Sequence, residues 1–248
     1  RKQQLLPHAG SFLLGPPTVV DGRLFVLSET DAAISLLQLD PETGRTLWSQ
    51  QLFGPASPVR QEALRRVSAD APVLVGGLLI CPSTSGLVAA VDYEQRQIVW
   101  TWRYETRVSR PRLNPALIAH VQIPMSLGNL SRPDRWQESA AMTAAGRLVI
   151  APADSDEVFC VDAVTGEQLW SEARRSGQYI AAVDAERVVI VERNGLRALS
   201  LDTGVTLWET TLNARLVSGR GVRAGSIYHL PVRLAMAPEA ADAAGATD

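Results

Sequence analysis

This sequence predicts an all-β fold: a β-propeller with about four complete four-stranded blades and part of a fifth, forming a segment of a seven- or eight-bladed ring. Three observations support this prediction. An eleven-residue phrase recurs along the 248-residue chain. Short β-rich runs separated by Gly and Asp turn signals precede each copy, as in antiparallel hairpins. The repeating unit has the length of a propeller blade, roughly 35–50 residues.

Each copy of the phrase ends in a tryptophan. The copies span 38–48, 90–100 and 160–170, and a shortened copy spans 200–208. An Asp that follows a strand can accept hydrogen bonds from backbone N–H groups two or three residues further on, which starts a turn. A Gly four residues before the Trp allows the positive φ that turns the chain back, and the Trp supplies a large apolar face with one donor. The residues of the phrase are Asp40, Gly44, Trp48, Asp92, Trp100, Asp162, Gly166, Trp170, Asp202, Gly204 and Trp208.

The strands follow in the same order in every unit. In the first unit they are expected at 17–20, 24–27, 34–40 and 46–52, and in the fourth at 179–183, 188–191, 196–202 and 206–212. The second unit has expected strands at 78–81, 87–92 and 98–104, and the third at 148–151, 157–162 and 168–173. Tight turns precede the second strand of each unit, at 21–22, 76–77, 145–146 and 185–186, which favours hairpins throughout.

The phrase resembles the tryptophan-docking motif, Ala-x-Asp-x-x-Thr-Gly-x-x-x-Trp, of the pyrroloquinoline-quinone-like (PQQ-like) propeller repeat family. The resemblance covers four blades, about residues 14–212, and implies that each Trp packs on the adjacent blade. Three copies depart from the motif. Gln95-Arg96 replaces Thr-Gly in the second copy, Gln38 replaces the leading Ala in the first, and the fourth lacks two residues before Thr203. Looser docking is expected in these copies.

Two insertions lengthen the units, because the Trp-to-Trp spacings are 52, 70 and 38 residues. The first insertion spans 53–71, with a short helix expected at 61–67, and the second spans 105–136. Loops of this length are uncommon and often functional. The second insertion therefore either contacts a ligand or partner or forms a lid whose arginines are solvated. Its candidate contact residues are Arg107, Arg110, Arg112, His120, Arg132, Arg135 and Trp136.

The ends of the chain are expected to lie outside complete blades. Residues 1–13 are interpreted as the end of a preceding blade, and 14–232 as the blades, with 216–232 forming two strands around a glycine turn. Residues 233–248 form an Ala-rich flexible tail or linker. Such a segment of a larger ring would leave an apolar face at each end of an arc, so the isolated chain is expected to associate.

Composition excludes several classes of function. Lys and Arg number 24 against 26 Asp and Glu, so the basic footprint of a nucleic-acid-binding protein is absent. The longest apolar run, 71–80, is about half of what a membrane-spanning helix needs. Cys81 and Cys160 fall in different units at unrelated strand positions, and both are expected to be free thiols acting as small buried hydrophobes.

No catalytic, cofactor-binding or metal-binding residue is assigned. The three histidines fall in different units, so a zinc site is not indicated. The turn at 154–157 holds three carboxylates, but calcium requires six to eight oxygens around a glycine-shaped loop, and a solvated turn is the favoured interpretation. Quinoprotein dehydrogenases of the resembled family carry a vicinal Cys-Cys pair, and this chain has no adjacent cysteines.

The favoured function is therefore a non-catalytic PQQ-like propeller segment that acts as a protein-interaction or envelope scaffold without a cofactor. It resembles the branch that contains outer-membrane-assembly lipoproteins. That resemblance implies a bacterial cell envelope or periplasmic location, with a protein and the rest of its own propeller as partners. One alternative is part of a PQQ-dependent quinoprotein dehydrogenase, with PQQ and calcium. Another is a propeller that binds a saccharide or small polar ligand at the face carrying 105–136.

Overall fold

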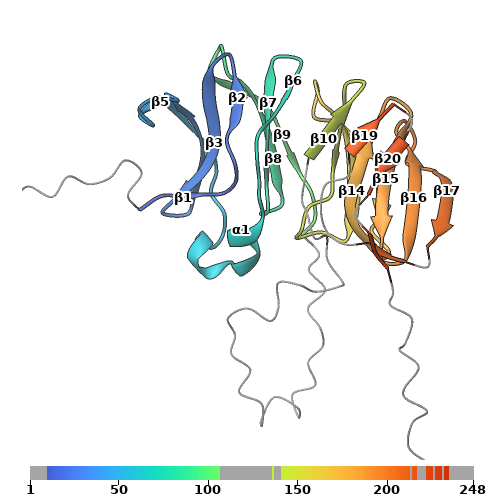
Figure 1. Ribbon diagram of the computed structural model, residues 1–248. Coiled ribbons are helices and arrows are strands. Elements are labelled where there is room, and N and C mark those ends of the chain that lie inside the picture. Colours follow the sequence, from blue (N-terminus) through green and yellow to red (C-terminus); the bar gives the residue numbers. More distant parts are fainter. Residues whose placement is uncertain are drawn as a thin grey trace, which may run out of the picture.

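The computed structural model describes residues 10–106, 136, 141–212, 214–216, 222–225, 227–230 and 232–234. Antiparallel sheets make up nearly all of this part of the chain. Figure 1 shows the sheets standing side by side in sequence order, as blades of a β-propeller do. The described residues therefore form an arc of blades, and the predicted all-β propeller fold is confirmed.

Four sheets correspond to the four predicted blades. The first contains β1 (Phe12–Leu13), β2 (Thr18–Val20), β3 (Arg23–Thr30), β4 (Ala33–Leu39) and β5 (Thr46–Phe53). The second contains β6 (Val73–Val75), β7 (Leu78–Ser83), β8 (Leu87–Asp92) and β9 (Gln97–Arg103). The third contains β10 (Ala141–Ala144), β11 (Arg147–Ile150), β12 (Glu157–Asp162) and β13 (Gln168–Ala173). The fourth contains β14 (Gly177–Val183), β15 (Arg187–Glu192), β16 (Gly195–Ser200) and β17 (Thr206–Thr211).

The first blade begins earlier than the sequence analysis expected. Its first strand is split in two, because β1 pairs with β3 at Phe12 and Glu29, while β2 pairs with the other end of β3. The intervening segment passes close to the first insertion: a Cβ on Gly15 would lie 2.4 Å from the Asp70 carbonyl oxygen. The segment continues through two prolines, which have no N–H to donate to a ladder. Phe12 and Leu13 therefore belong to this blade and not to a preceding one.

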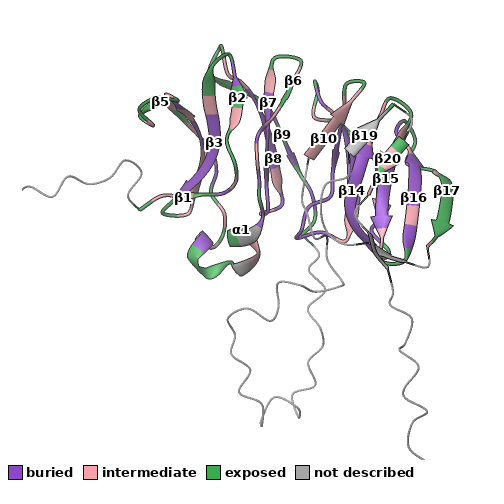
Figure 2. Cartoon of the chain, in the orientation of Figure 1, coloured by how far each residue is buried: buried purple, intermediate pink, exposed green. Residues whose placement is uncertain are grey.

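Apolar side chains from facing sheets form the core. Phe25 and Leu27 of the first sheet pack against Leu79 and Cys81 of the second. Two further clusters join the second sheet to the third and the third to the fourth. The middle strands are buried on both faces, which explains why they read as continuous apolar runs. Figure 2 shows this burial in β8 and β15, in contrast to the exposed outer strand β17.

A partial fifth unit follows the fourth blade. β19 (Val222–Ala224) and β20 (Ile227–His229) form a hairpin around Gly225, as the glycine turn predicts. β18 (Ala214–Leu216) also pairs with β21 (Val232–Leu234), which the sequence analysis did not anticipate. The Tyr228 hydroxyl donates to the Asp184 carboxylate at 2.7 Å, and this bond ties the unit to the fourth blade.

The first insertion folds into a 3-10 turn, Val59–Gln61, followed by the helix α1 (Ala63–Val67), close to the helix expected at 61–67. A buried ion pair anchors it to the first blade, with 3.0 Å between Arg65 Nε and Glu29 Oε2. The Glu29 carboxylate also accepts the Val59 N–H at 2.5 Å, and Arg65 donates to the Ser57 carbonyl. Among the described residues, no helix is long and apolar enough to cross a membrane.

Both cysteines are free and buried, as predicted. Burial raises the pKa of both thiols, that of Cys160 to about 12. We expect neither thiol to react with a thiol reagent in the native protein at pH 8, and both to react after unfolding without reductant. Titration with Ellman's reagent measures both states. A rapid reaction before unfolding would contradict the burial of these two strand positions.

Candidate functional site

The recurring phrase forms a tight turn between the third and fourth strands of each blade. In the first blade, Asp40 Oδ1 accepts the N–H groups of Glu42 and Thr43 at 3.0 and 2.9 Å. The same two bonds recur at Asp92 and at Asp162. The bond from the Thr43 N–H is the main reason that the pKa of Asp40 is lowered, since it stabilises the ionised form. These aspartates are therefore turn-forming residues.

Two of the tryptophans lie against the turn of the following blade. Trp100 donates its indole N–H to the Ala163 carbonyl at 3.2 Å, and Trp170 donates to the Leu201 carbonyl at 2.8 Å. Their rings cover the phrase glycines so closely that a Cβ on Gly166 would lie 2.6 Å from Trp100, and one on Gly204 would lie 2.8 Å from Trp170. The glycines thus provide space for the ring as well as a positive φ.

The other two tryptophans differ. Trp48 is only half-buried, and Trp208 is 37 % exposed compared with 9 % for Trp100 and 8 % for Trp170. The shared position of the four tryptophans in the phrase predicts that all are mostly buried in equivalent sites, and this prediction is wrong at Trp208. Both cases depend on the copy of the phrase that follows each tryptophan. In the copy after Trp48, Arg96 replaces the phrase glycine, and residues 209–248 contain no copy against which Trp208 could lie.

The fourth copy of the phrase is complete, and its description as shortened is wrong. Trp208 pairs with Ala198 just as Trp170 pairs with Cys160, so the copy runs over the full eleven residues from 198 to 208. Ser200 therefore occupies the place of the turn-forming Asp: its Oγ accepts the Thr203 N–H at 3.3 Å. Asp202 is an exposed residue within this turn. Counting ten residues back from the Trp would have given this alignment.

The connections between strands lie at two opposite ends of the sheets. The phrase turns lie at one end, together with the turns between the first two strands of each blade. The first insertion and the first residues of the second, 105–106, lie at the other end, with the turns at 31–32, 84–86, 151–156 and 193–194. We call this the insertion-bearing face. Figure 1 shows α1 at this end of the molecule, below the sheets.

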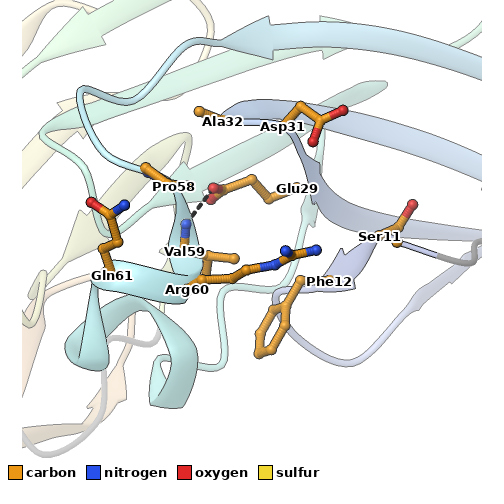
Figure 3. A pocket seen from close by; sticks show the side chains of 10 residues that line it. Ser11, Phe12, Glu29, Asp31, Ala32, Pro58, Val59, Arg60 and Gln61 are labelled. Atoms are coloured by element: carbon orange, nitrogen blue, oxygen red, sulfur yellow. Dashed lines mark hydrogen bonds between the residues drawn. The ribbon is translucent and has the colours of Figure 1, made fainter.

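A cavity of about 500 Å³ opens on the insertion-bearing face of the first blade. Its walls come from β1, from the turn between β3 and β4, and from the 3-10 turn of the first insertion. Figure 3 shows Arg60 reaching along the cavity toward Ser11 and Phe12, with Asp31 across from it and the Glu29 to Val59 hydrogen bond at its base. The cavity offers a cation, a carboxylate and an aromatic side chain side by side, which suits a mixed polar and apolar protein surface.

The structure changes the assignment of one predicted contact residue. Trp136 is only 2 % exposed and donates its indole N–H to the Glu157 carbonyl at 3.1 Å, so it is a core residue and not a surface contact. The other candidates in the second insertion, Arg107, Arg110, Arg112, His120, Arg132 and Arg135, lie outside the described residues. The cavity beside Arg60 was missed because its lining comes from three separate segments of the sequence, 10–12, 29–32 and 58–61.

The acidic turn at 154–157 is not solvated as expected. Asp154 is 6 % exposed and Ser155 is 3 % exposed. Burial, with a smaller contribution from the charge of Asp70, raises the pKa of Asp154 to about 6. Within the described part of the chain, no group of three or more His, Cys, Asp or Glu residues is arranged to hold a metal ion.

Comparison with known proteins identifies relatives among outer membrane protein assembly factors. The family model described as outer membrane protein assembly factor BamB matches residues 7–122 and 84–239. The BamB of Yersinia pestis is 29 % identical over 197 residues, which cover 79 % of this chain and 42 % of that protein. The crystal structure of BamB from Moraxella catarrhalis superposes with a TM-score of 0.56 at 14 % identity, over 85 % of this chain and 54 % of that chain. The chain thus spans about half the length of these relatives.

Proposed function

Because this chain belongs to the family of outer membrane protein assembly factor BamB, we propose that it is a non-catalytic scaffold of the bacterial cell envelope that binds other assembly proteins. The match to the family over most of the described blades is the observation that carries this proposal. The relatives are named for assembly of outer membrane proteins, in keeping with the envelope location expected from the sequence.

We place the partner-binding surface on the insertion-bearing face. Both insertions arise from this face, and the cavity beside Arg60 lies on it. Arg60 is exposed, and it belongs to a segment anchored by the buried Glu29 and Arg65 pair. A rigidly held cation at the rim of a cavity favours association with an acidic partner surface and contributes mainly to the association rate.

Charge reversal at Arg60 tests this proposal. We expect Arg60→Glu to weaken binding of purified outer membrane assembly proteins from the same organism by about 10-fold, since a favourable charge contact becomes repulsive. Biolayer interferometry with the full-length protein would give the dissociation constant. The matched control is Arg45→Glu, an exposed arginine in the phrase turn of the same blade, at the opposite end of the sheet. Two results would contradict the placement on this face. Either Arg60→Glu binds as tightly as the wild type, or both variants lose affinity to the same extent.

A further inference from the structure

A buried chain of three oxygen atoms joins the second and third blades on the insertion-bearing face. The Tyr104 hydroxyl lies 2.7 Å from the Ser83 carbonyl oxygen and 2.9 Å from Asp154 Oδ1. Tyr104 follows directly after β9, at the root of the second insertion, and Asp154 lies in the turn between β11 and β12. All three residues are at most 6 % exposed, so water has little access to complete their hydrogen bonds.

The two contacts require two hydrogen atoms. A carbonyl oxygen only accepts, an ionised carboxylate only accepts, and a tyrosine hydroxyl has a single hydrogen to donate. If Asp154 is ionised, Tyr104 can donate to Ser83 or to Asp154, but not to both. If Asp154 carries a proton, it can donate to the tyrosine oxygen while the tyrosine donates to Ser83. Only the protonated carboxyl completes the chain.

We propose that Ser83, Tyr104 and Asp154 form a proton-dependent lock between the second and third blades, which closes when the Asp154 carboxyl is protonated. The lock lies where both insertions are rooted. The neighbouring Asp70, which ends the first insertion, is 1 % exposed and accepts the Thr84 N–H at 3.0 Å. Mildly acidic conditions therefore stiffen the insertion-bearing face, independently of which partner binds there.

The surroundings of Asp154 favour proton uptake at mildly acidic pH. Among the described residues, the titratable groups that act on it are Tyr104, from the end of β9, and Asp70, from the first insertion, and neither supplies a positive charge. The backbone N–H groups of Asp154 and Gly86 favour the ionised carboxyl, but burial is the larger effect. Burial raises the pKa of Tyr104 well above its ordinary value, so its hydroxyl stays protonated and able to donate. Burial raises the pKa of Asp154 to about 6 from the ordinary 3.8.

The direction of the pH effect follows from these values. A carboxyl whose pKa is higher in the folded than in the unfolded protein binds a proton more readily when folded, so its contribution to stability grows as the pH falls from about 7 to about 4. The difference between about 6 and 3.8 corresponds to an about 100-fold change in the unfolding equilibrium constant. Asp40 and Asp162, whose pKa values are lowered, act in the opposite direction and only at lower pH.

Asp154→Asn is the direct test, since its amide keeps the shape of the side chain and an oxygen that accepts from Tyr104. We expect urea unfolding of the wild type to show the stability gain between pH 7.5 and pH 4.5, and the variant to lack it. Hydrogen exchange in segments 68–72 and 102–106, corrected for intrinsic rates, should slow at least 10-fold at pH 5 relative to pH 7.5 in the wild type only. Asp156→Asn is the matched control, because this carboxylate is in the same turn with 37 % of its side chain exposed.

A second variant keeps the test decisive if Asp154→Asn folds poorly. Tyr104→Phe keeps the buried ring but removes the hydroxyl that joins Ser83 to Asp154, so hydrogen exchange in 68–72 and 102–106 should no longer slow at pH 5 in this variant. The same pH dependence in wild type and Asp154→Asn, or acid-slowed exchange that persists in Tyr104→Phe, would overturn the proposed lock.

Discussion

Truncation of Trp170 to alanine should destabilise the protein by about 3–5 kcal/mol. The indole ring is 8 % exposed, lies over Gly204 and donates to the Leu201 carbonyl at 2.8 Å. Its removal leaves a cavity between the third and fourth blades, because the surrounding packed side chains relax only in part into the space. It also leaves the carbonyl without this donor, which adds to the loss. Urea unfolding followed by circular dichroism measures the free energy.

The matched control for this prediction is Trp208→Ala. Trp208 occupies the equivalent strand position in the fourth blade, but 37 % of it is exposed. We expect a loss below about 1 kcal/mol at this position, since exposed substitutions away from buried contacts change stability little. Similar losses at both positions, or a loss below 1 kcal/mol at Trp170, would show that the turn of the next blade contributes little to holding the indole.

Removal of Arg65 should have the second-largest effect. Arg65→Met leaves the Glu29 carboxylate buried without its counter-charge, and breaking a buried ion pair from one side costs about 3–5 kcal/mol. Because the pair anchors the insertion to the first blade, we also expect faster hydrogen exchange in α1. The free energy of unfolding in urea at pH 7.5 and the exchange rates of 59–67 measure the two effects.

The double variant Glu29→Gln with Arg65→Met separates charge from packing. Glutamine keeps an oxygen that can accept the Val59 N–H, while no buried charge remains. We expect the double variant to be more stable than Arg65→Met alone by at least about 1 kcal/mol. If the double variant is instead the less stable of the two, the loss on removing Arg65 comes from side-chain packing and not from an unpaired carboxylate.

Local sequence signals account for the blades. The short apolar runs and the turn residues act over two to six neighbouring positions, so each hairpin is specified where it occurs. The strands β7, β8, β12 and β13 accordingly lie within two residues of the expected ranges. The positions of Cys81 and Cys160 in strand-like runs, where a sister repeat has a small residue, also predicted that both would be buried, and both are.

The errors arose where a residue depends on a distant partner. Ser200 could not be recognised as the counterpart of the turn-forming Asp until the pairing of Ala198 with Trp208 placed it. Trp136 seemed to belong to a surface insertion, but its indole N–H binds a carbonyl 21 residues away. The acidic turn was interpreted as solvated because nothing near Asp154 in the sequence indicates that Tyr104, 50 residues earlier, covers it.

The sequence by itself determined the repeat, the order of the strands, the positions of both insertions and the resemblance to a propeller family. Only the tertiary structure decided that Arg60 borders a cavity, that Glu29 is paired with Arg65, and that Asp154 is enclosed with Tyr104. The physical reason is the range of the interactions. Turn formation and strand alternation depend on adjacent residues, whereas cavities, buried ion pairs and perturbed pKa values depend on side chains that only the packing of one blade on another brings together.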